Sequence, residues 1–68
     1  MPFCHIYARR NGTYAVRMHG AVTKGDLKGK IELSSMPFPS EEAARAWVRD
    51  GREAMGLDDM PEPKVIRR

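Results

Sequence analysis

Three side chains near the N-terminus, Cys4, His5 and His19, are of types that bind metals or act as a nucleophile and its base. A zinc site needs three or four ligands at suitable spacing, and these three are only loosely placed. A Cys–His nucleophile needs a third group that orients the histidine and an oxyanion site, and the sequence identifies neither. An isolated cysteine in a strand is usually a small buried hydrophobe. We therefore expect no catalytic residue, no metal, no cofactor and no enzymatic activity.

Basic side chains are concentrated in the first half of the chain. Residues 1–33 contain six Lys or Arg and two Asp or Glu, a net charge of +4, whereas residues 34–68 contain six and seven, a net charge of −1. This asymmetry favours an anionic partner, most commonly nucleic acid. The alternative is an ordinary solvated surface on a small domain whose total net charge is +3. The residues that we expect to contact nucleic acid are Arg9, Arg10, Thr13, Arg17, His19, Lys24, Lys28 and Lys30.

A β-hairpin is the element that must position most of these residues. Asn11-Gly12 follows a strand predicted over Phe3 to Arg10, and this dipeptide favours a two-residue type I′ turn. In that register Arg10 pairs with Thr13, and Cys4 pairs with His19. A slip by one residue would invert the assignment of faces.

Alternation along the two strands then gives the hairpin two faces. We expect the bulkier face to pack against a helix, and it contains Phe3, His5, Tyr7, Arg9, Tyr14, Val16 and Met18. We expect the other face to meet solvent or a partner, and it contains Cys4, Ile6, Ala8, Arg10, Thr13, Ala15, Arg17 and His19. Tyr7 and Tyr14 are of the type that stacks on bases of a single strand, but this register places them in the core.

The segment from His19 to Lys30 leaves two alternatives open. It either extends the second strand through Val22 or forms a basic loop, and its three glycines and three lysines slightly favour the loop. Lys30 to Met36 alternates as a third strand, which Pro37 ends.

The stretch from Ser40 to Gly56 predicts an amphipathic helix. Ser40 is a favourable N-cap, and Gly56 is a favourable C′ residue. An apolar stripe at helical spacing contains Ala43, Ala44, Trp47, Val48, Ala54 and Met55. On the outer surface, the i,i+4 pairs of opposite charge are Glu41–Arg45 and Arg49–Glu53.

The resulting fold class is α+β, a three-stranded antiparallel sheet packed against one C-terminal helix in the order βββα. We place a single domain at residues 1–57 and a loosely ordered tail at residues 58–68, because the tail contains two prolines and few apolar residues. A short edge strand at Val65-Ile66 is the alternative. The single cysteine indicates a reducing compartment, and no apolar run approaches the ~18 residues of a membrane span. We therefore expect a cytoplasmic protein without a membrane segment.

The pattern IYARRNGTYAVRM, a third strand and FPSEEAARAWVRDGREAMG resembles the small N-terminal arm-binding domains of phage and transposon tyrosine integrases. The helix entry of that family matches at Phe38, Ser40, Glu42, Ala43 and Trp47. The resemblance implies a three-stranded sheet that enters the major groove of double-stranded DNA, here as a free-standing module.

A second resemblance, to HicB-type antitoxins, lies in Gly12, Thr13, Tyr14, Val16, Glu41, Glu42 and Ala43. The lysine-rich segment of this chain stands where that family has an acidic segment, so we rank this resemblance second. Small phage-encoded inhibitors such as anti-CRISPR proteins also have this size. Our main expectation is a non-catalytic module that binds double-stranded DNA through the basic exposed face of its sheet and its lysine-rich loop. The alternative is a protein-interaction module that occludes a protein partner, and a homodimer through an uncovered sheet edge or face is compatible with either.

Overall fold

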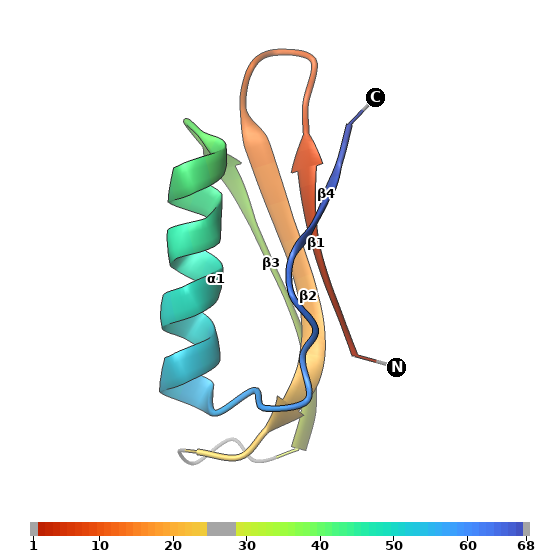
Figure 1. The fold of residues 1–68 in the computed structure, drawn as a ribbon, viewed down its shortest axis with the longest axis vertical. Helices are drawn as coiled ribbons and strands as arrows, with labels where there is room; N and C mark the ends of the chain where they lie inside the picture. The colour runs from red at the N-terminus through yellow and green to blue at the C-terminus, as the bar shows by residue number, and fades with distance from the viewer. Residues whose placement is uncertain (1, 25–28, 68) are drawn as a thin grey trace.

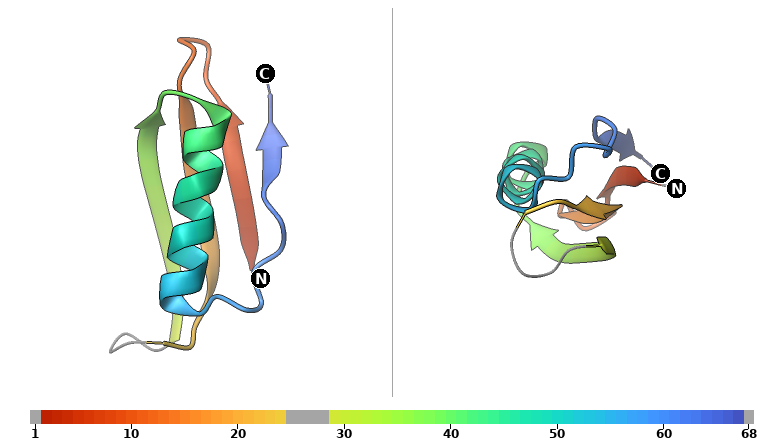
Figure 2. Two further views of the ribbon diagram at one scale, coloured as in Figure 1. Left: turned by 60° about the vertical axis from the view of Figure 1, so that its left-hand side comes forward. Right: turned by 90° about the horizontal axis from the view of Figure 1, so that it is seen from below.

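A computed structural model describes residues 2–24 and 29–67 of the chain (Figure 1). The elements are β1 (Phe3–Ala8), β2 (Tyr14–Val22), β3 (Gly29–Phe38), α1 (Glu41–Met55) and β4 (Lys64–Ile66). The strands form one sheet in the order β3-β2-β1-β4, and α1 lies across one of its faces (Figure 2). Among the described residues, no helix has the length and apolar character needed to cross a membrane.

The sheet is mixed, which corrects the predicted three-stranded antiparallel sheet. The α+β class and the single helix are confirmed, but β4 adds a fourth strand that runs parallel to β1. The chain reaches this position because α1 carries it from β3 at one edge of the sheet to the opposite edge (Figure 1). A parallel pair requires such a long connection. The open choice after His19 is also decided, because β2 extends through Val22.

The register of the β1–β2 hairpin differs from the prediction by one residue. Cys4 pairs with Met18, and the Arg9 N–H donates to the Thr13 carbonyl at 2.9 Å, so the loop has three residues. The Gly12 N–H donates to the Arg9 carbonyl at 3.2 Å, and Gly12 has φ +83°, whereas no described residue other than a glycine has a positive φ. A type I′ turn needs positive φ at both central residues, so the predicted two-residue turn is wrong.

This shift turns β1 over relative to β2. The predicted orientation of β2 is confirmed, since Val16 and Met18 are buried beneath α1. The predicted orientation of β1 is wrong, because Cys4 and Ile6 are buried with them and Tyr7 lies on the opposite face. Within the described chain, the fully buried core consists of Cys4, Ile6, Val16, Met18, Val22, Ala44, Val48, Leu57 and Met60.

We call the sheet face opposite α1 the open face. Strand alternation and the pairing register give its members. They are Phe3, His5 and Tyr7 of β1, Ala15, Arg17, His19 and Ala21 of β2, Lys30, Glu32 and Ser34 of β3, and Lys64 and Ile66 of β4.

The caps of α1 agree with the prediction from sequence. The Ser40 hydroxyl accepts a hydrogen bond from the Ala43 N–H at 3.1 Å. Gly56 ends the helix in the left-handed conformation, with φ +62°, and its N–H donates to the Arg52 carbonyl.

The C-terminal segment contributes to the core and adds a strand to the sheet. Met60 is 2% exposed, and Val65 packs against the core from β4. An oxygen of the Asp59 carboxylate accepts a hydrogen bond from the Ala21 N–H at 3.1 Å, where β2 extends past the start of β1. Residues 58–67 thus satisfy part of the sheet edge and close one end of the core.

Candidate functional site

A row of rings runs along the open face. Phe3, His5 and Tyr7 alternate on β1, and His19 lies opposite Phe3 on β2. The Phe3 ring stacks on His5 with centroids 5.1 Å apart and on His19 with centroids 5.7 Å apart. Tyr7 meets His5 edge-on, and its hydroxyl lies 3.2 Å from the Nδ1 of His5. These rings are half-buried against each other, so their outward surfaces form a preformed aromatic strip.

Arg17 lies beside this strip. Its Cζ is 5.7 Å from the centroid of the Phe3 ring, and its Nε donates to the Oε1 of Glu32 at 2.6 Å. The hydrogen bond and charge of Glu32 raise the pKa of Arg17 above its usual value, so the guanidinium stays charged. Glu32 therefore holds the guanidinium in one orientation while half of the Arg17 side chain, 53%, remains exposed.

A recess lies over Ala15, where the side chain is short. One hollow of about 460 Å³ is lined by Tyr7, Ala15, Arg17, Ser34 and Met36, together with the neighbouring Val16 and Ser35. A second hollow of about 330 Å³ lies towards the hairpin loop and is lined by Tyr7, Ala8, Arg9, Arg10, Ala15 and Met36. Tyr7 and Met36 thus form two walls of both hollows, and arginines stand at both ends.

Met36 forms an exposed apolar wall of this recess. Its side chain is 62% exposed, and it is the only large hydrophobic residue of the described chain that is so exposed. Nη1 of Arg9 reaches its Sδ at 3.5 Å, across the sheet from β1 to β3. The contact brings one cation to the rim of the hollow.

The open face is also the cationic side of the molecule. Glu32 is the only carboxylate that the described residues place there, and it is paired with Arg17. Of the nine acidic residues of the chain, seven lie on α1 or between α1 and β4. Lys30 and Lys64 stand on the open face beyond the rings, so positive charge flanks the aromatic strip on both edges of the sheet.

The structure brings together some of the predicted contact residues and separates others. Arg9, Arg10 and Arg17 line the recess, His19 stacks in the ring cluster, and Thr13 pairs with Arg9 at the end of the hairpin. Lys30 is at the far end of β3, opposite Ala21.

Two predicted contact residues do not join this group. Lys24 lies beside the C-terminus of α1, where its N–H donates to the Met55 carbonyl and its Nζ lies 3.5 Å from the Glu53 carbonyl. Lys28 lies outside the described residues.

Four residues of the site were not predicted from sequence: Phe3, His5, Tyr7 and Met36. The three-residue loop is the signal that would have found the first three. When Gly12 is the only residue of the hairpin loop at positive φ, the alternation pattern places the odd-numbered residues of both strands on one face.

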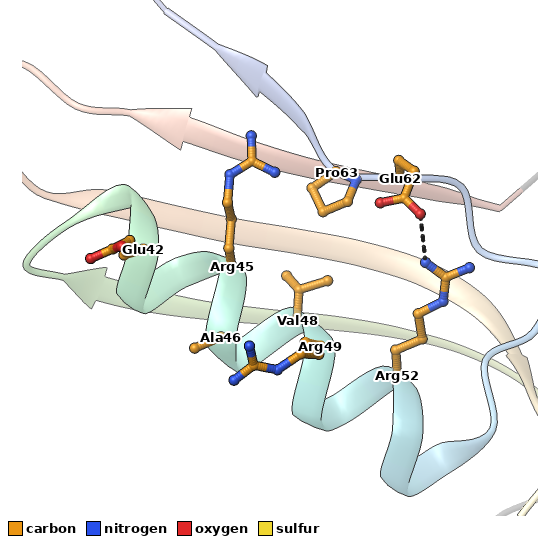
Figure 3. A pocket seen from close by; sticks show the side chains of 8 residues that line it. All are labelled: Glu42, Arg45, Ala46, Val48, Arg49, Arg52, Glu62 and Pro63. Atoms are coloured by element: carbon orange, nitrogen blue, oxygen red, sulfur yellow. Dashed lines mark ion pairs between the residues drawn. The ribbon is translucent and has the colours of Figure 1, made fainter.

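A second concave surface lies between α1 and the segment before β4 (Figure 3). This groove has a volume of about 430 Å³. Arg45 and Arg52 flank Val48 there, facing Glu62 and Pro63 across the groove.

The arginines of this groove are paired with carboxylates. Arg45 binds Glu41 at 3.1 Å, which confirms that predicted pair, while Arg49 lies 3.5 Å from Asp50 in place of the predicted Glu53. Arg52 lies 3.6 Å from Glu62, the pair marked in Figure 3. The positive charge of the groove is therefore balanced locally, unlike that of the open face.

Cys4 and His19 do not form a pair. Cys4 lies on the helix side of β1 and His19 on the open face, so the predicted facing arrangement is wrong. Burial raises the pKa of the Cys4 thiol, and the nearby charge of Arg52 opposes this only in part. Within residues 2–24 and 29–67, no three His, Cys, Asp or Glu side chains lie close enough together to hold a metal ion.

No protein-family model, curated protein or solved structure matches this chain. The resemblances to integrase arm-binding domains and to HicB antitoxins therefore stay predictions.

Proposed function

We propose that this protein binds nucleic acid on the open face of its sheet and prefers single strands. The observation that supports this most is the recess over Ala15, which has an aromatic wall at Tyr7 and arginines at both ends. Proteins that bind single strands combine aromatic stacking platforms with a positively charged surface.

In this proposal an unpaired base occupies the recess. Its flat face stacks on Tyr7, its edge lies over the short side chain of Ala15, and Met36 closes the other side. The neighbouring rings of His5 and Phe3 continue the strip for the next bases along β1. Stacking on an aromatic side chain contributes about 1–3 kcal/mol per base.

Cations at the ends of the recess supply the backbone contacts. Arg9 and Arg10 lie on the side of the hairpin loop, and Arg17 lies on the other side. A phosphate accepts hydrogen bonds from a guanidinium in a bidentate geometry, so these positions suit the backbone on either side of a stacked base. Lys30 and Lys64 extend the positive surface further.

Double-stranded DNA is the less favoured ligand for this face. A sheet that reads the major groove needs polar side chains that project to the base edges. The centre of the open face instead presents rings, Ala15 and the exposed Met36. Duplex binding is therefore the alternative that the experiment must separate from single-strand binding.

The test is fluorescence anisotropy with short labelled oligothymidine, oligouridine and duplex DNA over a salt series. For single strands, counterion release predicts a log–log slope of about −0.7 per phosphate contacted, so three contacts give a slope near −2. We expect Tyr7→Ala to weaken binding by about 5- to 150-fold because a stacking contact is lost, whereas Tyr7→Phe retains binding.

A matched pair of arginine variants locates the site. Arg17→Ala should weaken binding and reduce the salt slope, while Arg49→Ala, on the outer side of α1, should change neither beyond the effect of net charge. Tighter binding to duplex that is insensitive to Tyr7→Ala would replace the single-strand proposal with the groove-binding one. Absence of binding at low salt would overturn both and favour a protein partner.

A further inference from the structure

One edge of the sheet is long and has a partner on one side only. β3 contains ten residues, Gly29–Phe38, and pairs with β2 through its inner side. Among residues 2–24 and 29–67, no strand pairs with its outer side, and the opposite edge of the sheet is formed by the three residues of β4. A long unpaired edge presents a row of backbone donors and acceptors that pairs readily with another strand.

We propose that β3 pairs with β3 of a second copy of this chain, antiparallel, about a two-fold axis at Ile31. This pairing makes one continuous sheet with eight strands, with four from each copy. It does not depend on the proposed function, because it concerns the edge of the sheet and not the open face.

The charges on β3 select the axis. An axis at Ile31 places Lys30 opposite Glu32 of the second copy, and the symmetry produces this contact twice. An axis at Glu32 would instead place the Glu32 carboxylates of the two copies opposite each other. An axis at Leu33 would place Lys30 opposite Met36 of the second copy. Opposite charges that face each other across a strand pair stabilise it, and like charges destabilise it.

The existing pair with Arg17 is compatible with this contact. Glu32 accepts the hydrogen bond of Arg17 from the inner side of β3, at 2.6 Å, and its side chain is 46% exposed. A carboxylate has two oxygens and accepts several hydrogen bonds, so it can bind Arg17 and the ammonium group of a second copy together.

The side of α1 that lies beside this edge is largely uncharged. Trp47 is half-buried, and its ring centroid is 5.8 Å from that of Phe38 at the end of β3. Ala43 and Ala54 share this side of the helix, at positions i−4 and i+7 from Trp47. The arginines of the groove lie on the other side, towards β4 (Figure 3). A second copy paired about Ile31 would cover the half-buried side chains of Ile31 and Leu33, which continue the apolar layer of the core.

In this dimer the open faces of the two copies lie next to each other. Edge-to-edge pairing about a two-fold axis places both helices on one side of the joined sheet and both open faces on the other. Two aromatic strips would then lie on one continuous surface, and a long single strand that reached both would bind with the gain in avidity that two linked sites give.

The test is sedimentation or light-scattering mass of the full chain without nucleic acid, at high micromolar concentration. We expect a mass of twice 7.7 kDa for the unmodified chain. Lys30→Glu and Glu32→Lys should each weaken the dimer by about tenfold or more, because each variant creates two like-charge contacts. The double variant Lys30→Glu/Glu32→Lys should restore the dimer, and an equimolar mixture of the two single variants should form a heterodimer.

Two control variants separate this contact from other effects of charge. Arg17→Ala removes the partner of Glu32 within the chain, and Lys64→Glu reverses a charge at the opposite edge, so both should remain dimeric. Circular dichroism melting of every variant checks that it is folded. A monomeric unmodified chain, single variants that remain dimeric, or a folded double variant that stays monomeric would each overturn the proposal.

Discussion

Ala15 shapes the recess through the shortness of its side chain. Tyr7, Met36 and the arginines surround it, and a larger side chain at this position would fill the space that we assign to a base. Because Ala15 belongs to the open face, enlarging it does not disturb the core beneath α1.

We predict that Ala15→Leu weakens binding to single-stranded nucleic acid by about tenfold or more, since it blocks the stacking of a base on Tyr7. Ala21→Leu is the matched control, on the same strand and face but beyond the ring cluster. Anisotropy titration of both variants with oligothymidine measures the effect. Equal affinities for the two variants would show that the recess over Ala15 is not occupied.

Cys4 gives a second prediction at this scale, for stability and pH. Its side chain is 1% exposed, and burial raises the pKa of its thiol above the ordinary value of 9.0. In the unfolded chain the thiol loses its proton near that ordinary value, whereas the folded chain retains the proton to higher pH. The free energy of unfolding should therefore decrease as the pH rises above about 9.0 towards the folded-state pKa.

Urea unfolding over this pH range, with Cys4→Ala as the control, isolates the contribution of the thiol from that of tyrosines and lysines. The unmodified chain should lose more stability with rising pH than the variant does. A thiol reagent should also label native Cys4 slowly, at a rate that follows opening of the fold. Labelling as fast as in a denatured chain would contradict the burial of Cys4.

Among the elements, the helix and the hairpin loop both end in a glycine at positive φ, but their surroundings differ. A Cβ at Gly12 would enter open space, with no heavy atom within 4 Å, whereas a methyl group at Gly56 would collide with the hydroxyl of Thr23. That hydroxyl donates to the Gly56 carbonyl at 2.6 Å, which ties the end of β2 to the end of α1.

We therefore predict that Gly56→Ala destabilises the fold more than Gly12→Ala does. Gly12→Ala should cost about 1–2 kcal/mol, the penalty of the left-handed conformation for an L-residue. Gly56→Ala adds the displacement of Thr23 to that penalty. Chemical denaturation measures the free energy of unfolding of both variants. Equal decreases in the two variants would contradict the close contact at the helix end.

The segment after Gly56 gives a prediction about the boundary of the domain. A chain that ends at Leu57 lacks Met60 and β4, so its core is exposed at one end and β1 loses the three residue pairs that it makes with β4. Truncating a buried methionine side chain alone costs about 2–5 kcal/mol, a large share of the stability of a domain of this size.

We predict that residues 1–57 do not melt cooperatively, whereas the full chain does. The stability of Met60→Ala, measured by thermal denaturation, should lie between that of residues 1–57 and that of the full chain. A cooperative transition of residues 1–57 near that of the full chain would show that the domain ends at Leu57, as expected from sequence.

Local sequence signals predicted the helix correctly but predicted the wrong loop for the hairpin. The helix was predictable because an apolar stripe at helical spacing lies between Ser40 and Gly56, two residues of types that favour helix ends, and both act as caps. Asn11-Gly12 serves two loop types, and which one forms depends on whether one or two residues adopt positive φ. This single difference moved Tyr7 from the predicted core to the open face.

The fourth strand had only a weak local signal, the two β-branched residues Val65 and Ile66. β4 has three residues and follows Pro61 and Pro63, and its pairing with β1 joins residues far apart in the sequence, such as His5 and Lys64. The candidate site was therefore half predictable: its arginines stand out by charge, but the aromatic strip depends on the register of the hairpin.

At the scale of the whole molecule, the two sides of the sheet have different properties. The side of α1 contains most of the acidic residues, and its arginines are paired with them. The open face holds rings, a recess and cations around a single carboxylate of the described chain. A sheet with a helix on only one face leaves the other face available, and this is the surface on which we place the ligand.

The measurement that most directly tests whether the open face binds nucleic acid is an ¹H–¹⁵N NMR titration of the chain with short oligothymidine. We predict chemical-shift changes at Phe3–Tyr7 and Ala15–His19, with little change at Arg45–Arg52 on the other side of the sheet. Changes confined to the groove between α1 and β4, or no changes at low salt, would contradict the assignment of the open face as a nucleic-acid-binding surface.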